Sequence, residues 1–286
     1  MLISKQLRRW WLGLNTLFGS QSHGYYIPSK ASRYDSRNAG NLSYQHWRTR
    51  INEVASTQVQ WLKLADRYER DLRKIDGTGK EKARWTQDWF PRLDAVMLYS
   101  MVRHFKPKRI IEIGVGHSTR FVARAIRDEG IEVVHIAIDP EPSKEIPQAP
   151  NLCWFVKPVQ SAGKEIWEKI GPRDIVSIDS SHILMPGSDV DFLFNEIVPF
   201  LAAGVIVHVH DIFLPDDYPL DWHWRGYNEQ CAVASFLAAS NAELMFSSHF
   251  VSHYLKTTFS STEIAKLPIQ PQARESSIWF RIASGE

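Results

Sequence analysis

Short apolar runs alternate with helix-like segments from residue 109 to the end of the chain, and this alternation constrains the fold more than any other feature. The runs cover residues 109–113, 131–138, 151–156, 174–178, 205–209, 243–247 and 276–282. Short, continuously apolar runs are typical of strands that are buried on both faces of a sheet. Strands that alternate with helices form mostly parallel sheets with helices on both faces. The sequence therefore predicts an α/β fold with a doubly wound sheet.

Helix-like segments separate most of these runs, and one connection includes a long loop. They cover residues 118–127, 163–170, 190–201 and 227–239. That loop, residues 212–225, has no period and is rich in Pro, Asp, Tyr and Trp. Connections of this length are often functional lids. Trp222, Trp224 and Tyr227 either stack on a ring of a ligand or hold the loop on the domain, and the sequence leaves both readings open.

The first half of the chain lacks this alternation. Met1–Phe18 is predicted to be an amphipathic helix that packs on its own domain, and residues 43–75 and 90–105 have helical periods. No stretch approaches about 18 uninterrupted apolar residues, so no transmembrane helix is expected. We predict an N-terminal helical extension, residues 1–85, followed by an α/β domain, residues 86–286. Several of the 11 tryptophans fall in the extension, where they would pack on the sheet or form the face of a homodimer.

The charge is divided unevenly along the chain. Residues 1–110 contain 21 Lys and Arg against 9 Asp and Glu, whereas residues 111–286 contain 13 against 23. The basic residues are spread out and form no Lys/Arg block, so no nucleic-acid partner is expected. The chain has only two cysteines, Cys153 and Cys231, which give no disulfide framework. We interpret both as buried apolar residues of a protein in a reducing, cytoplasmic compartment.

Acids, glycines and a histidine gather at the ends of four predicted strands. They are Glu112 with Gly114 and Gly116, then Asp139-Pro140, then Asp179, and finally His210-Asp211. Turns alone favour such residues, so each taken singly has a structural explanation. In open α/β sheets, however, ligands bind at the carboxyl ends of the strands. Four coinciding strand ends therefore predict a ligand site at this edge.

The turn after the first strand is the most informative of the four. Gly114 and Gly116 allow the backbone to approach a ligand closely, and Ser118 or Thr119 can cap the following helix. Thr119 stands where a dinucleotide-binding turn has its third glycine, which argues against a nicotinamide cofactor. Asp139, at the end of the second strand, is placed to accept hydrogen bonds from ribose hydroxyls.

The segment IIEIGVGHST, residues 110–119, followed by Ile138-Asp139-Pro140, resembles the class I S-adenosylmethionine-dependent methyltransferases. Two later segments, Asp174–His182 and Val207–Pro215, resemble a bacterial subgroup that acts on small molecules or glycans. The resemblance covers about residues 90 to 282. It implies a Rossmann-like, seven-stranded sheet whose last strand is antiparallel.

The resemblance also implies roles for the residues at the strand ends. Glu112, Gly114 and Gly116 would surround the methionine part of S-adenosylmethionine, and Asp139 would bind its ribose. Ser118 and Pro140 belong to the same predicted cofactor site, as does Asp179. The segment Val159-Gln160-Ser161 would flank the adenine, although Gln160 replaces an acid that many relatives have.

The catalytic assignment leaves alternatives open. In some relatives, acids placed like Asp179 and Asp211 hold Mg²⁺, which would lower the pKa of an acceptor hydroxyl. In metal-free relatives, an acid placed like Asp211 orients a loop or the cofactor. The spacing Asp179-x-x-His182 resembles sugar methyltransferases in which the histidine is the base, so His182 is the first candidate base and His210 the second. His208 is expected to face away from His210 and to belong to the core.

These observations lead to one preferred function and two rivals. We expect transfer of a methyl group from S-adenosylmethionine to a hydroxyl of a small molecule or glycan. A nucleotide-dependent oxidoreductase has the same layered plan, but it predicts the third glycine that Thr119 replaces. A binding protein that retains the cofactor fold without catalysis is the other alternative. Methylation of nucleic-acid bases ranks low because the chain lacks an Asn/Asp-Pro-Pro-Tyr motif.

Overall fold

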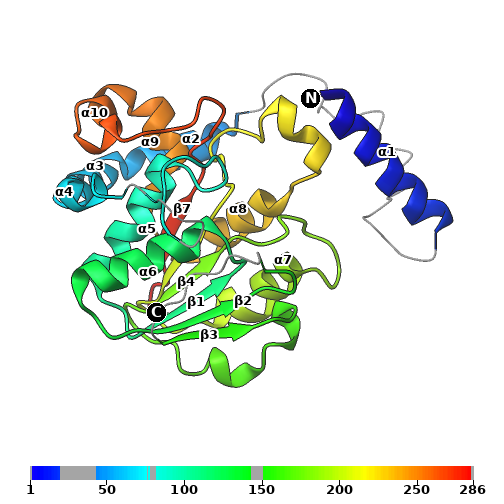
Figure 1. Cartoon of the computed structure of the whole chain (residues 1–286), viewed down its shortest axis with the longest axis horizontal. Helices are drawn as coiled ribbons and strands as arrows, with labels where there is room; N and C mark the ends of the chain where they lie inside the picture. The colour runs from blue at the N-terminus through cyan, green and yellow to red at the C-terminus, as the bar shows by residue number, and fades with distance from the viewer. Residues whose placement is uncertain (1, 20–42, 76, 78–81, 143–150, 285–286) are drawn as a thin grey trace.

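A seven-stranded sheet forms the centre of the molecule in the computed structural model, which describes residues 2–19, 43–75, 77, 82–142 and 151–284 (Figure 1). Its strands are β1 (Arg109–Ile113), β2 (Val134–Ile138), β3 (Leu152–Phe155), β4 (Ile175–Ile178), β5 (Ile206–Val209), β6 (Glu243–Ser247) and β7 (Ile278–Arg281). The strand order is β3-β2-β1-β4-β5-β7-β6. Strands β1 to β5 pair in parallel, whereas β7 is antiparallel to both β5 and β6. The predicted sheet and its antiparallel last strand are thereby confirmed.

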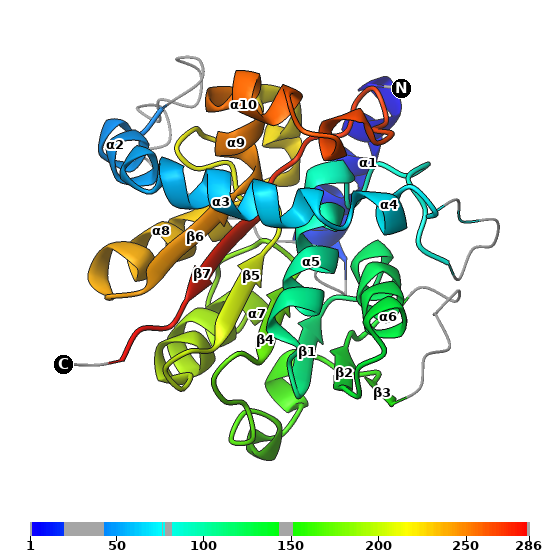
Figure 2. The same ribbon diagram turned by 90° about the vertical axis from the view of Figure 1, so that its left-hand side faces the viewer.

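The central strand β1 contributes to two apolar cores. Ile110 faces the core under α5 (Arg92–Phe105) and α6 (His117–Glu129), while Ile111 and Ile113 face the core on the opposite side. Successive side chains of a strand point to opposite faces, so a continuous apolar run serves both layers. Figure 2 shows α5 and α6 in front of the sheet, and α7 (Asp189–Phe192) and α8 (Glu229–Ala239) behind it.

The N-terminal helices share the front core with the sheet. The single helix predicted for residues 43–75 is divided into α2 (Gln45–Glu53), α3 (Ala55–Asp66) and α4 (Glu69–Leu72). Gln58 on α3 is fully buried, donates to the carbonyl of Ile51 and accepts the amide N–H of Ser247. These bonds tie α3 to the end of β6. The domain boundary at residue 85 stays a prediction, because apolar residues on both sides of it lie in one core.

Helix α1 (Leu2–Phe18) forms as predicted, but none of the large apolar side chains that the structure describes on it is buried. Trp10 is 70% exposed and Phe18 is 85% exposed. The expectation that this helix packs its apolar face on the domain is therefore wrong. Among the described residues, no helix is long and apolar enough to cross a membrane.

Several local predictions need correction. Residues 163–170 form only a 3₁₀ turn, Lys164–Ile166, because Gly163 has φ +90° and Gly171-Pro172 follows closely. The helix predicted for 190–201 changes after α7 into a π turn and then a 3₁₀ turn that contains Pro199. The loop 212–225 includes a 3₁₀ helix, Leu220–Arg225. Two short helices, α9 (Ser248–Tyr254) and α10 (Lys256–Ser260), were not predicted because so few residues define no period. Both cysteines are exposed rather than buried.

Candidate active site

The turn after β1 brings the ends of three strands together. Gly114 has φ +81°, and its N–H donates to the carbonyl of Ile138 at 3.0 Å. A Cβ atom at this position would overlap the carbonyl oxygen of Asp179. Only glycine combines this φ with such a close approach between β1 and β4. The first predicted glycine is therefore required by the geometry of the turn.

Asp139 stabilises this turn from the end of β2. One carboxylate oxygen accepts the N–H of Val115 at 2.8 Å, and the other accepts the N–H of Glu141 at 2.7 Å. A carboxylate has about four acceptor positions, so further hydrogen bonds remain open to it. Asp139 is thus oriented by the backbone and can still accept from a bound hydroxyl.

A cavity of about 380 Å³ lies beside the turn, at the carboxyl ends of β1, β2 and β4. Of the predicted cofactor residues, Gly114, Asp139, Pro140, Gln160 and Asp179 line it. The volume is within the usual range of small-molecule sites. Ser181 and Asp189, which the sequence analysis missed, also line it and bond to each other.

The other predicted cofactor residues lie beneath this cavity or beside it. Glu112 is fully buried and accepts a hydrogen bond from Ser118 Oγ at 2.6 Å, while its second oxygen lies 2.9 Å from His135 Nε2. These bonds fix the start of α6 to β1 and β2. Gly116 precedes α6, and its N–H donates to Thr119 Oγ1. Direct contacts of Glu112, Gly116 and Ser118 with a cofactor stay predictions.

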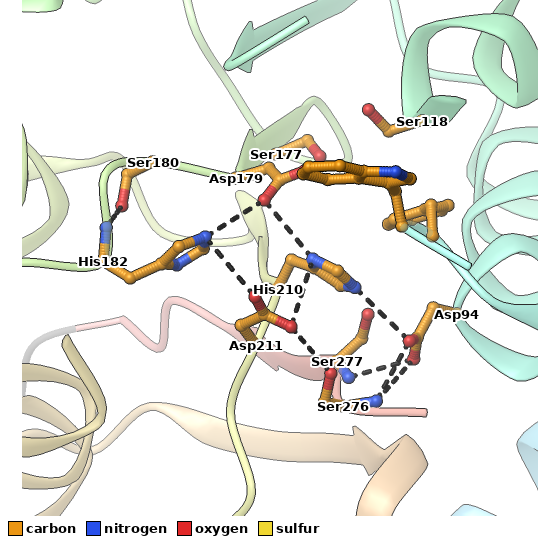
Figure 3. Close-up of polar contacts among 12 residues, drawn as sticks. Asp94, Ser118, Ser177, Asp179, Ser180, His182, His210, Asp211, Ser276 and Ser277 are labelled. Carbon is orange, nitrogen blue, oxygen red and sulfur yellow. Dashed lines mark hydrogen bonds and ion pairs between the residues drawn. The ribbon is translucent and has the colours of Figure 1, made fainter. Parts of the chain in front are cut away.

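The first candidate base, His182, lies in the loop after β4 and is 5% exposed. Its Nδ1 lies 2.8 Å from Glu229 Oε2 on α8. Its Nε2 lies 3.4 Å from Asp179 Oδ1 and 3.6 Å from Asp211 Oδ2 (Figure 3). Glu229 therefore orients the ring, and Nε2 points toward the carboxylate that lines the cavity.

The second candidate, His210, lies on the other side of the same two carboxylates. Its Nδ1 is 3.3 Å from Asp179 and 3.7 Å from Asp211, and its Nε2 is 3.4 Å from Asp94 Oδ2 (Figure 3). Asp94, on the first turn of α5, is fully buried and accepts the backbone N–H groups of Ser276 and Ser277. Four carboxylates and two imidazoles thus form one cluster, which we call the acid–imidazole cluster: Asp94, Asp179, His182, His210, Asp211 and Glu229.

The charges of this cluster shift its protonation equilibria strongly. Burial alone would lower the pKa of His182, but its bonds with Asp179 and Glu229 raise it well above its usual value. The same competition, led by the charges of Asp211 and Asp179, raises the pKa of His210. Burial would raise the pKa of Asp179, but the two histidines hold it below its usual range. The raised pKa values keep both imidazoles protonated at neutral pH. The carboxylates of the cluster outnumber these two positive charges, and the resulting negative charge favours a cationic ligand nearby.

The expectation that His208 faces away from His210 is wrong. Residues two apart on a strand point to the same face, and the two rings lie 6.4 Å apart. His208 is fully buried, and its ring nitrogens pair with Ser177 Oγ and Ser277 Oγ. Burial lowers the pKa of His208 to about 3. His208 is therefore a neutral histidine of the core, beneath the acid–imidazole cluster. The expectation that it belongs to the core is confirmed.

The aromatic residues of the 212–225 segment pack mainly on one another. Trp222 contacts Phe213 and Tyr227 edge to face, and the guanidinium of Arg225 lies 3.9 Å from the ring centroid of Trp222. Tyr227 also covers the ring of His182 at 4.5 Å between centroids. These contacts favour the reading that the aromatic residues hold the loop on the domain.

Two acids of the cluster escaped the sequence analysis. Asp94 lies on the first turn of an apolar helix, where an acid ordinarily complements the helix dipole. Glu229 opens α8, where a polar residue ordinarily caps the helix or contacts solvent. Neither residue lies near His182 or His210 in sequence. The available signal was burial: Asp94 adjoins the apolar stripe of residues 90–105, where a charge requires a partner.

The geometry does not fit the predicted magnesium site. Asp179 and Asp211 are the only two predicted ligands, and the imidazoles of His182 and His210 both lie within 3.7 Å of these carboxylates. Carboxylate oxygens that face imidazolium groups are poor donors for a hard cation. No group of three or more His, Cys, Asp or Glu that could hold a metal occurs among the described residues.

Comparisons with known proteins agree with this site. A family profile described as "Methyltransferase domain" matches residues 111–212, which run from the middle of β1 to just after β5 and include the strand ends discussed above. No curated protein matches. The profile match therefore identifies a methyltransferase domain in the part of the chain that carries the glycine turn and the adjoining cavity.

Solved methyltransferase structures show weak similarity over most of the chain. The S-adenosylhomocysteine-bound methyltransferase PaMTH1 of Podospora anserina has 16% identity and a TM-score of 0.41, covering 91% of this chain and 100% of its own. A putative methyltransferase of Thermobifida fusca has 13% identity and a TM-score of 0.41, covering 68% and 84%. The plantazolicin methyltransferase BpumL has 11% identity and a TM-score of 0.39, covering 79% and 98%. These values are too low to carry an argument about the acceptor.

Proposed function

We propose that this chain is an S-adenosylmethionine-dependent methyltransferase that acts on a hydroxyl group of a small molecule or glycan, with His182 as the general base. The observation that carries this proposal is the orientation of His182. Glu229 binds one ring nitrogen, and the other faces Asp179 at the wall of the cavity. A base that is held by a second carboxylate and aimed at the ligand site is typical of proton abstraction from a hydroxyl.

The cofactor supplies an electrophilic methyl group on a sulfonium when it is bound. Gly114, Asp139, Pro140 and Gln160 would hold it, since they line the cavity at the strand ends. Asp179 separates this cavity from His182 and would place negative charge near the sulfonium. The chain would then position the acceptor hydroxyl and remove its proton at His182 Nε2.

Proton removal requires the neutral form of His182. Because its carboxylate partners raise the pKa of this histidine, the neutral form increases only on the alkaline side of pH 6.5. Transfer to a hydroxyl should therefore accelerate as the pH rises. His210 has the same carboxylate neighbours, but its second nitrogen faces Asp94 instead of α8, so we assign it to holding Asp179 and Asp211 in place.

The test is release of S-adenosylhomocysteine in the presence of matched acceptors. A panel of phenols and sugars is compared with the corresponding amines and thiols, with and without EDTA. We expect turnover of hydroxyl acceptors that rises with pH and is insensitive to EDTA. Turnover of amines alone would contradict the assignment of the base. Loss of activity in EDTA that Mg²⁺ restores would reinstate the metal-assisted alternative.

A further inference from the structure

A second and larger cavity, of about 870 Å³, lies on the side of the molecule covered by α2, α9 and α10. Figure 2 shows α9 and α10 together above the sheet, with α2 beside them. This second cavity shares no lining residue with the first cavity, at the carboxyl ends of β1, β2 and β4, which we call the cofactor cavity after its proposed ligand. Its apolar lining includes the rings of Phe213, Tyr254 and Phe259 together with Pro219, Ala265 and Ala273. It is therefore a separate space, large enough for a ligand that contains a ring.

Most charged groups around this cavity already have partners. Arg92 binds Glu275, and both are largely buried. Asp216 accepts from the hydroxyl of Tyr254 at 2.8 Å and lies 2.8 Å from His249 Nε2. In the same wall, Arg274 pairs with Asp221 outside the cavity. Burial lowers the pKa of His253, which keeps this ring neutral at neutral pH.

Two cations remain without an acidic partner among the described residues. Arg48 binds only the hydroxyl of Tyr254, at 2.7 Å, and stacks 4.8 Å from its ring centroid. Lys256, two residues after Tyr254, makes no ion pair within the part of the chain that the structure describes. Two carboxylates of the lining oppose them: Asp217, which accepts the N–H of Tyr218, and Asp216, whose partner His249 is charged only if protonated. Arg48 and Lys256 are thus the two cations of this wall that have no ion-pair partner in the part of the chain that the structure describes, and Arg48 lies against the ring of Tyr254.

The cavity adjoins the acid–imidazole cluster along three segments. Arg92 lines it, and Asp94 two residues later faces His210. Phe213 lines it two residues after Asp211, and Glu275 lines it immediately before Ser276, which donates to Asp211. The wall of this cavity therefore continues into three segments that carry members of the acid–imidazole cluster or contact it.

We propose that this cavity binds the anionic end of the methyl acceptor, a carboxylate, sulfate or phosphate attached to an apolar ring. Arg48 and Lys256 bind the anion, and the rings of Phe213, Tyr254 and Phe259 contact the apolar part. The cations supply charge-assisted hydrogen bonds, and the rings supply apolar surface. The assignment to the acceptor rests on the function proposed above, whereas the affinity for an anion does not.

The test uses 1-naphthyl phosphate as the probe and neutral 1-naphthol as its counterpart, titrated calorimetrically into the full chain. We expect 1-naphthyl phosphate to bind in the presence of saturating S-adenosylhomocysteine. Arg48→Gln and Lys256→Gln should each weaken it about tenfold, which corresponds to about 1.4 kcal/mol. The exposed Lys169→Gln serves as the matched control and should change nothing. Binding of 1-naphthol should be the same in all variants.

Equal affinity of the parent chain and both variants for the phosphate would overturn the site, as would displacement of the probe by S-adenosylhomocysteine. A third outcome separates this proposal from the proposed function: the chain binds the probe through Arg48 but does not bind S-adenosylhomocysteine. That result would support an anion site and refute its role in binding a methyl acceptor. With any hydroxyl acceptor that turns over, 1-naphthyl phosphate should inhibit competitively. Inhibition that is noncompetitive against the acceptor would contradict that role.

Discussion

The cofactor cavity and the acid–imidazole cluster are neighbours that are built in different ways. The cavity is formed by short segments directly after β1, β2 and β4, and its key contacts involve backbone groups such as the N–H groups bound by Asp139. The cluster combines side chains from α5, from the segments that follow β4 and β5, and from α8, which lie far apart in the sequence. Asp179 belongs to both.

This difference separates binding from chemistry. A ligand site made of backbone groups and glycines depends on the shape of the turn, and it should tolerate changes in distant side chains. A cluster of opposite charges depends on every partner, because an unpaired buried charge is costly. Substitutions in the two regions should therefore affect different measured quantities.

The largest effect is expected at the proposed base. His182→Gln should lower kcat by about 10²- to 10⁴-fold, the usual contribution of a general base. Binding of S-adenosylhomocysteine should change less than about twofold, because His182 does not line the cofactor cavity. Calorimetry and S-adenosylhomocysteine release measure the two quantities. A comparable loss of both would show that the regions do not act separately.

A substitution in the turn should have the opposite signature. In Gly114→Ala, the new Cβ would meet the carbonyl of Asp179 at a backbone φ of +81°. We expect the dissociation constant for S-adenosylhomocysteine to rise about 100-fold, or about 2.7 kcal/mol. Gly171→Ala is the control, since its Cβ would meet nothing within 4 Å. Circular dichroism checks that both variants fold, and an unchanged affinity of Gly114→Ala would refute the required close approach.

A smaller and more specific effect is expected from the partner of the base. Glu229→Gln removes a carboxylate that stabilises the protonated form of His182, so the pKa of His182 should fall. The alkaline rise of kcat/KM should consequently move to lower pH, while the plateau decreases about tenfold through looser orientation of the ring. The exposed Glu243→Gln is the matched control. An unchanged pH dependence of kcat/KM in Glu229→Gln would show that Glu229 does not raise the pKa of His182.

The sequence allowed several residues of the cavity at the strand ends to be predicted because their signals are local. Gly114 and Asp139 each follow an apolar run, and parallel strands bring such positions to one edge. The cluster was predicted only for Asp179, His182, His210 and Asp211, which also follow strands. Asp94 and Glu229 come from helix starts, and only tertiary packing places them beside the histidines. The magnesium alternative lacks support for a similar reason, since only tertiary packing shows that imidazoles face both carboxylates.

The measurement that tests the central claim most directly is titration of S-adenosylhomocysteine into the parent chain, Asp139→Ala and His182→Gln. Asp139 lines the cavity and orders the turn, whereas His182 lies beyond Asp179. The account predicts binding by the parent chain, a loss of at least about tenfold in Asp139→Ala, and parent-like binding in His182→Gln. Absence of binding by the parent chain, or equal losses in both variants, would contradict it.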